Sequence, residues 1–101
     1  MTVEKIKAGD VLKAIICGRV DTSTAPQLEA EVKDDLDSVT KLILDLNGLD
    51  YISSAGLRVL LTMQKIMNEQ GSMRVVGVNE TVYEIFEVTG FTDILTIERA
   101  E

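Results

Sequence analysis

The chain has 101 residues, 46% of them hydrophobic and 27% charged, and a formal net charge of −7. These values indicate one folded domain with a single hydrophobic core over residues 1–101, and they exclude a disordered chain. A chain without histidine and with one cysteine has no Ser-His-Asp triad and no ordinary zinc site, and an acidic chain without clustered Lys and Arg is not expected to bind nucleic acid.

The first residues predict a β-hairpin. Residues 3–7 and 11–17 have the apolar and β-branched composition of strands. Between them, Gly9 permits a tight reversal of the chain. Cys17 lies in the apolar run of the second strand, so we expect a buried structural thiol and not a reactive one.

A helix with an acidic outer face is predicted after the hairpin. Thr24 followed three residues later by Gln27 fits a capping box, and Pro26 is tolerated in a first helical turn. The apolar face of this helix consists of side chains that recur every four residues, which are Leu28, Val32 and Leu36.

The centre of the chain predicts a strand and then a long helix. Residues 41–46 form a short, almost continuous apolar run, which is typical of a strand covered by helices on both faces. A turn at Asn47-Gly48 leads to a helix over residues 53–70, and Gly71 is expected to end it in a left-handed conformation.

The last third repeats this alternation. Residues 73–78 predict a strand, Asn79 is expected to cap a helix that Gly90 ends, and residues 94–97 predict a final strand. Strands that alternate with helices indicate an α/β fold. We expect a mostly parallel central sheet with an antiparallel N-terminal hairpin and with helices packed on the sheet.

Two adjacent serines stand where the long helix begins. Ser53 is well placed as the N-cap, because a serine oxygen accepts a hydrogen bond from an unpaired amide of the first turn. Ser54 then lies in the first turn without a structural role, near a helix N-terminus that tolerates a phosphate. The local pattern leaves two interpretations open, a plain helix start and a site of modification.

Three further side chains of this helix lie outside its predicted core face. Placing successive residues 100° apart gives a core face that consists of Gly56, Val59, Leu60, Met63, Ile66 and Met67. Leu57 and Leu61 lie on the flank of Ser54, where they are either covered by a neighbouring element or form an exposed patch for a partner. Arg58 is either a solvated charge or a contact to a partner or a phosphate.

The stretches GRVDTSTAPQLEAEV, LILDLNGLDYISSAGLRVLL and IFEVTGFTDILTI together resemble the STAS domains of bacterial anti-sigma factor antagonists. The resemblance covers essentially the whole chain and keeps its order and spacing. It implies that Ser54, aligned through Gly56, is phosphorylated by a serine kinase that is also the anti-sigma factor. The motif reads Ser-Ser-Ala-Gly here, so Ser53 stands where many kinase-regulated members have aspartate.

The resemblance also implies a cycle of partner exchange. The unphosphorylated chain would bind the anti-sigma factor and free a sigma factor. The phosphorylated chain would release the anti-sigma factor until a PP2C-type serine phosphatase removes the phosphate. Asp21 matches an acidic position at the kinase interface of the family, and it is equally well explained as a turn residue before a helix. The expected partner-binding residues are Asp21, Ser53, Leu57, Arg58 and Leu61.

Two other functions are weighed against this one. The first is a constitutive STAS subunit or scaffold of a transport or signalling complex, in which Ser54 only starts a helix. The second is a Ser-based hydrolase, which lacks an evident general base. We therefore expect a protein that is not an enzyme and needs no cofactor. No apolar run reaches the roughly 20 residues of a membrane span and no signal peptide is evident, so we expect a cytoplasmic location.

Overall fold

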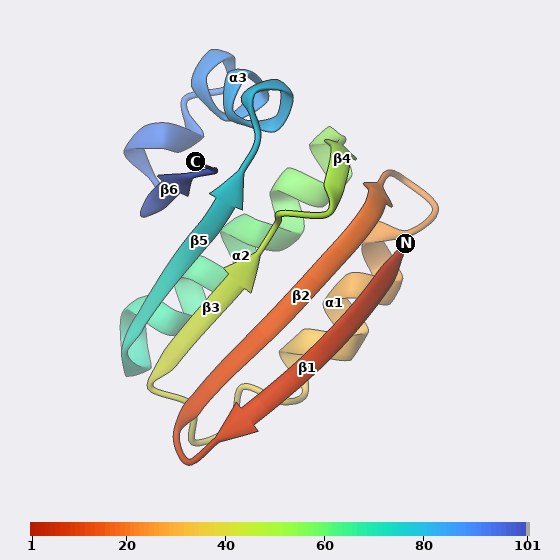
Figure 1. Ribbon diagram of the computed structural model, residues 1–101. Helices are drawn as coiled ribbons and strands as arrows, with labels where there is room; N and C mark the ends of the chain where they lie inside the picture. The colour runs from red at the N-terminus through yellow and green to blue at the C-terminus, as the bar shows by residue number, and fades with distance from the viewer. Residues whose placement is uncertain (101) are drawn as a thin grey trace.

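The computed structural model describes residues 1–100 and contains the predicted hairpin at its N-terminus (Figure 1). β1 (Thr2–Ala8) and β2 (Val11–Val20) pair antiparallel. β2 continues past its predicted end at residue 17, and its register against the neighbouring strand β4 shifts between Gly18 and Arg19. Gly18 has a φ of 94°, which glycine adopts without strain. The register shift leaves Asp50 of β4 without an opposite residue on β2, as in a β-bulge, and β2 continues to Val20.

The sheet has six strands in the order β1-β2-β3-β5-β6, with β4 paired to β2 off this path. The remaining strands are β3 (Lys41–Asp45), β4 (Leu49–Ile52), β5 (Ser72–Val78) and β6 (Ile97–Arg99). Every pairing except that of β1 with β2 is parallel. The predicted α/β fold with a mostly parallel sheet and an antiparallel hairpin is confirmed.

Two strands differ from the prediction. β4 lies where the sequence predicts only a loop, because its four residues LDYI are too few to show a strand pattern. The last strand begins at Ile97 and not at residue 94, since η1, a short 3-10 helix (Phe91–Asp93), and the buried Leu95 precede it. β6 lies at the sheet edge, where charged side chains are tolerated, and its Glu98 pairs with Arg74 of β5 at 3.1 Å.

The helices lie in the predicted regions, but the first one ends at Lys33, so Leu36, predicted for its apolar face, is buried beyond the helix. α1 (Ala25–Lys33) and α2 (Ser54–Gln70) lie side by side on one face of the sheet, and α3 (Glu80–Val88) follows the carboxyl end of β5 (Figure 1). The Asn79 side chain accepts a hydrogen bond from the Val82 N–H at 2.9 Å, which confirms the predicted cap of α3. Gly90 follows this helix with a φ of 80°, as expected of a left-handed helix end.

Two predictions about helix ends are wrong. Thr24 forms no capping box, because its hydroxyl donates to the Arg19 carbonyl oxygen at 3.0 Å and accepts from the Asp21 N–H at 2.9 Å. Gly71 is extended, with a φ of 170°, and not left-handed. A glycine is needed there because a Cβ atom would overlap the Thr40 carbonyl oxygen.

The sheet is covered by α1 and α2 on one face only, so the expectation that helices cover both faces of β3 is wrong. Along β3, Leu42 and Leu44 are buried, whereas Ile43 on the other face is half-buried. Ile43 stands in register between Lys13 and Arg74, whose aliphatic stems can shield it without a helix. The expectation that Cys17 is buried is also wrong: it is half-buried, because it projects from this uncovered face.

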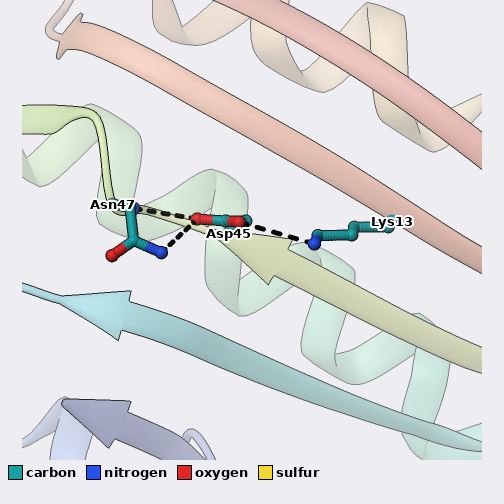
Figure 2. A network of polar contacts seen from close by, with 3 residues as sticks. All are labelled: Lys13, Asp45 and Asn47. Carbon is teal, nitrogen blue, oxygen red and sulfur yellow. Dashed lines mark hydrogen bonds and ion pairs between the residues drawn. The ribbon is translucent and has the colours of Figure 1, made fainter. Parts of the chain in front are cut away.

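A polar network on the uncovered face fixes the turn that leads into β4 (Figure 2). The Asp45 carboxylate accepts hydrogen bonds from the Asn47 N–H at 3.0 Å and the Asn47 side-chain amide at 2.8 Å, and Lys13 Nζ lies 3.6 Å away. Partial burial opposes ionisation of Asp45, but the hydrogen bonds and the lysine charge outweigh it, so the pKa of Asp45 lies below its ordinary value. The turn is therefore held by a charged group.

Candidate functional site

The carboxyl ends of β2 and β4 bring the predicted site residues together. Val20 stands opposite Ile52 in this parallel pair, and the Ser53 N–H donates to the Val20 carbonyl oxygen at 2.8 Å. Asp21 follows β2 directly, and Ser53 and Ser54 follow β4 directly. The start of α1 and the start of α2 thus lie at one edge of the sheet (Figure 1).

The two serines at this edge have different environments. Ser53 has an extended backbone, and its Oγ accepts a hydrogen bond from the Gly56 N–H at 3.4 Å, so the predicted N-cap is confirmed. Ser54 is the first residue of α2 and is exposed. Its hydroxyl takes part in no hydrogen bond within residues 1–100, the part of the chain that the structure describes. Ser54 is therefore the serine that can be modified without loss of a structural contact.

Gly56 sets the position of the first turn of α2. A Cβ atom on Gly56 would lie 2.6 Å from Ile52 Cγ1 and 2.7 Å from Val20 Cγ1. Both side chains are buried, with 2% and 1% of their surface exposed, so they cannot move aside. The missing side chain lets α2 begin close against β2 and β4, which holds Ser54 at the edge of the sheet.

Asp21 organises the loop that precedes α1. Its Oδ1 accepts hydrogen bonds from the Ser23 hydroxyl at 2.7 Å, the Ser23 N–H at 3.0 Å and the Thr24 N–H at 3.1 Å. The Ser23 hydroxyl is the main cause that lowers the pKa of Asp21, so the side chain is ionised at neutral pH. The turn role of Asp21 is confirmed, and its contact with a partner stays a prediction.

Of the two interpretations of Leu57 and Leu61, the exposed patch is wrong at Leu57, which is covered. The Leu57 side chain is 5% exposed and belongs to the core, whereas Leu61 is half-buried. The buried arc of α2 is rotated from its predicted position toward Leu57 and Gln64, and Ile66 on the opposite side of the arc is only partly covered. A helical pattern gives the apolar face only roughly when a leucine lies at its border. Leu61, about two helical turns after Ser54, is the leucine that stays partly exposed on this flank of α2.

A groove of about 450 Å³ lies between α1 and α2, beginning at the residue after Ser54. Its walls include Thr22, Pro26, Glu29, Ala55, Arg58 and Thr62. Arg58 is exposed there, and its side chain is in no ion pair within the described residues. This groove was not predicted from the sequence. The signal was the pair of small residues, Ala25 and Ala55, near the start of both helices.

Two kinds of feature, a membrane-spanning helix and a metal-binding cluster, are absent from residues 1–100. No helix in this part of the chain is long and apolar enough to cross a membrane. The same residues contain no group of three or more acidic or cysteine side chains placed to hold a metal ion.

Comparison with known proteins gives consistent matches. A family model described as "STAS domain" matches residues 3–101. A protein of Bordetella bronchiseptica named "Putative anti-sigma factor antagonist BtrV" is 39% identical over an alignment of 99 residues, which covers 96% of this chain and 84% of that protein.

Two solved structures share the fold. An anti-sigma factor antagonist from Mycobacterium paratuberculosis has a TM-score of 0.87 at 22% identity, over 96% of this chain and 84% of that chain. The anti-sigma factor antagonist SpoIIAA in its unphosphorylated form has a TM-score of 0.82 at 16% identity, over 95% of this chain and 87% of that chain. At these identities the likeness shows a common fold.

Proposed function

Because the chain belongs to the STAS domain family, we propose that it is an anti-sigma factor antagonist, the role named for its 39% identical relative. In this role it binds an anti-sigma factor and so frees a sigma factor for transcription. Binding takes place at the edge of the sheet where α1 and α2 begin. Asp21, Arg58 and Leu61 contact the partner, and Ser53 and Leu57 support the surface from beneath.

Phosphorylation of Ser54 controls this binding. The observation that carries the proposal is that Ser54 is exposed and its hydroxyl is in no hydrogen bond within the described residues, while its neighbour Ser53 already serves as the cap. The kinase is the anti-sigma factor itself, and a PP2C-type phosphatase reverses the reaction. Binding of the partner therefore depends on whether one hydroxyl is phosphorylated.

The physical effect of the phosphate is local. It adds about −1.5 to −2 charges, which changes the formal net charge from −7 to about −9. The unpaired N–H groups at the start of α2 tolerate this charge, so the fold is kept. At the centre of an interface, a hydrated dianion without a cationic partner costs several kcal/mol to desolvate. Since each 1.4 kcal/mol is tenfold in affinity, binding weakens about a hundredfold or more.

The experiment is incubation of the chain with its cognate anti-sigma factor and ATP, followed by mass spectrometry of the intact protein and its peptides. One phosphoryl group is expected on Ser54. Ser54→Ala should accept none, whereas the matched variant Ser53→Ala should still be modified. Full incorporation into Ser54→Ala would exclude Ser54 as the acceptor. If a transporter protein is recovered with the chain and binds Ser54→Glu as well as the wild type, the chain is instead a constitutive subunit of a transport complex.

A further inference from the structure

Arg19 and Tyr51 form a stacked pair next to the edge that carries Ser54. The guanidinium carbon of Arg19 lies 4.5 Å from the centroid of the Tyr51 ring. The two residues stand directly opposite each other in the pairing of β2 with β4. Arg19 is exposed and Tyr51 is half-buried. A cation–π contact of this kind holds an otherwise flexible arginine in one place on the surface.

The direction of the pair follows from the strands. Val20 and Ile52, the next residues along, point toward α2, where they meet Gly56. Successive side chains of a strand point to opposite faces, so Arg19 and Tyr51 project from the face that α1 and α2 leave uncovered. Asp21 follows Arg19 by two residues, and Ser53 follows Tyr51 by two residues. We call the end of the sheet where Ser53 and Ser54 follow β4 the serine edge. The groove with Arg58 lies next to it on one face of the sheet, and Arg19 and Tyr51 lie next to it on the other face.

The charge of Arg19 has no partner within the chain as far as the structure describes it. Its side chain is in none of the ion pairs of residues 1–100, although the chain has 17 acidic residues against 10 Lys and Arg. A planar guanidinium held by stacking keeps its N–H donors free for a carboxylate, which it binds in a fixed geometry. Arginine and tyrosine are also among the side chains that are enriched at the energetically dominant positions of protein interfaces.

We propose that Arg19 and Tyr51 are part of the partner-binding surface, and that Arg19 binds a carboxylate side chain of the anti-sigma factor. The inference rests on the proposed function and extends its surface to the second face of the sheet. The partner then contacts the serine edge on both faces of the sheet. A phosphate on Ser54 would enter the middle of this contact.

The chain contains its own control. Arg99 lies 4.2 Å from the centroid of the Tyr83 ring, so the same chemistry occurs a second time. That pair lines a hollow of about 290 Å³ together with Glu80, Glu84 and Glu87. The Arg99 side chain thus shares a hollow with three carboxylate-bearing residues of the chain itself. Tyr83 lies in α3 and Arg99 in β6, so neither belongs to the β2–β4 pair. A partner at the serine edge should engage the first pair and leave the second alone.

The first test is hydroxyl-radical footprinting with the purified anti-sigma factor that the wild-type chain retains from its source cells. The chain has two tyrosines, so they report on the two pairs separately. Oxidation of Tyr51 is expected to fall when the partner is added, and oxidation of Tyr83 is expected to stay constant. Equal oxidation of Tyr51 with and without the partner would overturn the inference, even if variants of Arg19 fail to fold.

The second test is calorimetric measurement of Kd for matched variants of equal thermal stability. Arg19→Ala is expected to raise Kd about tenfold or more, and Arg99→Ala to change it less than about twofold. Arg19→Lys keeps the charge but loses the planar contact, so it should restore only part of the affinity.

The outcomes separate the two proposals. If Ser54→Glu releases the partner but Arg19→Ala binds like Arg99→Ala, the Arg19 surface is wrong and the proposed function stands. If Arg19→Ala weakens binding but Ser54→Glu has no effect, the surface stands and the phosphorylation switch is wrong.

Discussion

Ser53 Oγ accepts a hydrogen bond from the Gly56 N–H at 3.4 Å, so the residue before Ser54 performs the capping that Ser54 would otherwise share. Ser53→Ala should lower the free energy of unfolding by about 0.5–1 kcal/mol, since the contact is long and a lost N-cap typically costs about 1 kcal/mol. Ser54→Ala should change it by less than about 0.5 kcal/mol. Urea unfolding followed by circular dichroism measures both. Equal losses for the two variants would show that the capping role is shared.

Charge at Ser54 should affect binding and not stability. Ser54→Glu places a carboxylate at the start of α2, where it is tolerated or slightly favourable, so Tm should change by only a few degrees. Binding of the anti-sigma factor should weaken about a hundredfold or more. Ser72→Glu is the control, because Ser72 is also exposed but lies at the start of β5, on the opposite edge of the sheet. A similar loss of binding for Ser72→Glu would point to overall charge as the cause.

Leu57 and Leu61 should respond differently to truncation, although they are one helical turn apart. Leu57 is 5% exposed, so Leu57→Ala creates a cavity and should cost about 2–4 kcal/mol of unfolding free energy. Leu61 is half-buried, so Leu61→Ala should cost about 1 kcal/mol and should weaken partner binding. Urea unfolding and calorimetric titration separate the two effects. Full affinity in a folded Leu61→Ala variant would remove Leu61 from the interface.

The elements with strong local patterns could be predicted from the sequence. The hairpin, the caps at Ser53 and Asn79, and the long α2 each follow from turn chemistry, capping chemistry or helical period. These signals lie within a few residues of one another. They therefore do not depend on the rest of the fold.

Features that depend on tertiary contacts could not be read in the same way. β4 exists because β2 extends beyond β3 and offers it a partner, which no property of LDYI reveals. Gly71 is fixed by the nearby Thr40 carbonyl oxygen and not by its own φ. The burial of Leu57 depends on the rotation of α2 over the sheet, and a helical period does not fix that rotation.

The absent side chain of Gly56 should matter for both stability and binding. Gly56→Ala places a Cβ 2.6 Å from Ile52 Cγ1 and 2.7 Å from Val20 Cγ1, so the start of α2 must shift. We expect a loss of about 1–3 kcal/mol, even though alanine favours a helix by about 1 kcal/mol over glycine. Partner binding should weaken as Ser54 moves.

A second glycine provides the control for this variant. A Cβ atom added at Gly90 would have no neighbouring atom within 4 Å, but Gly90 has a φ of 80°. Gly90→Ala should therefore cost about 1–2 kcal/mol through backbone strain alone and should leave binding unchanged. Unfolding and titration of both variants distinguish a displaced helix from general destabilisation. Unchanged binding in a folded Gly56→Ala variant would contradict the link between this packing and the serine edge.

Asp21 and Asp45 should make the free energy of unfolding depend on pH only in the acid range. The pKa of each carboxyl lies below its ordinary value in the folded chain, because the Ser23 hydroxyl stabilises the ionised Asp21, and Asn47 and Lys13 outweigh the partial burial of Asp45. A depressed folded-state pKa stabilises the fold above the unfolded-state pKa of about 3.9. This stabilisation is lost as the pH falls through the lower folded-state value.

Urea unfolding at a series of pH values tests this expectation. The free energy of unfolding should be nearly constant from about pH 6 to 8, since the chain has no histidine to titrate there, and it should fall below about pH 4. Asp45→Asn should be less stable than the wild type at pH 7 and should lose less stability on acidification, because the proton that the wild type must bind on unfolding is no longer involved. Asp37→Asn is the control, since Asp37 is exposed and in no ion pair within residues 1–100. An acid transition that is identical in Asp45→Asn and the wild type would show that the network in Figure 2 adds nothing to acid stability.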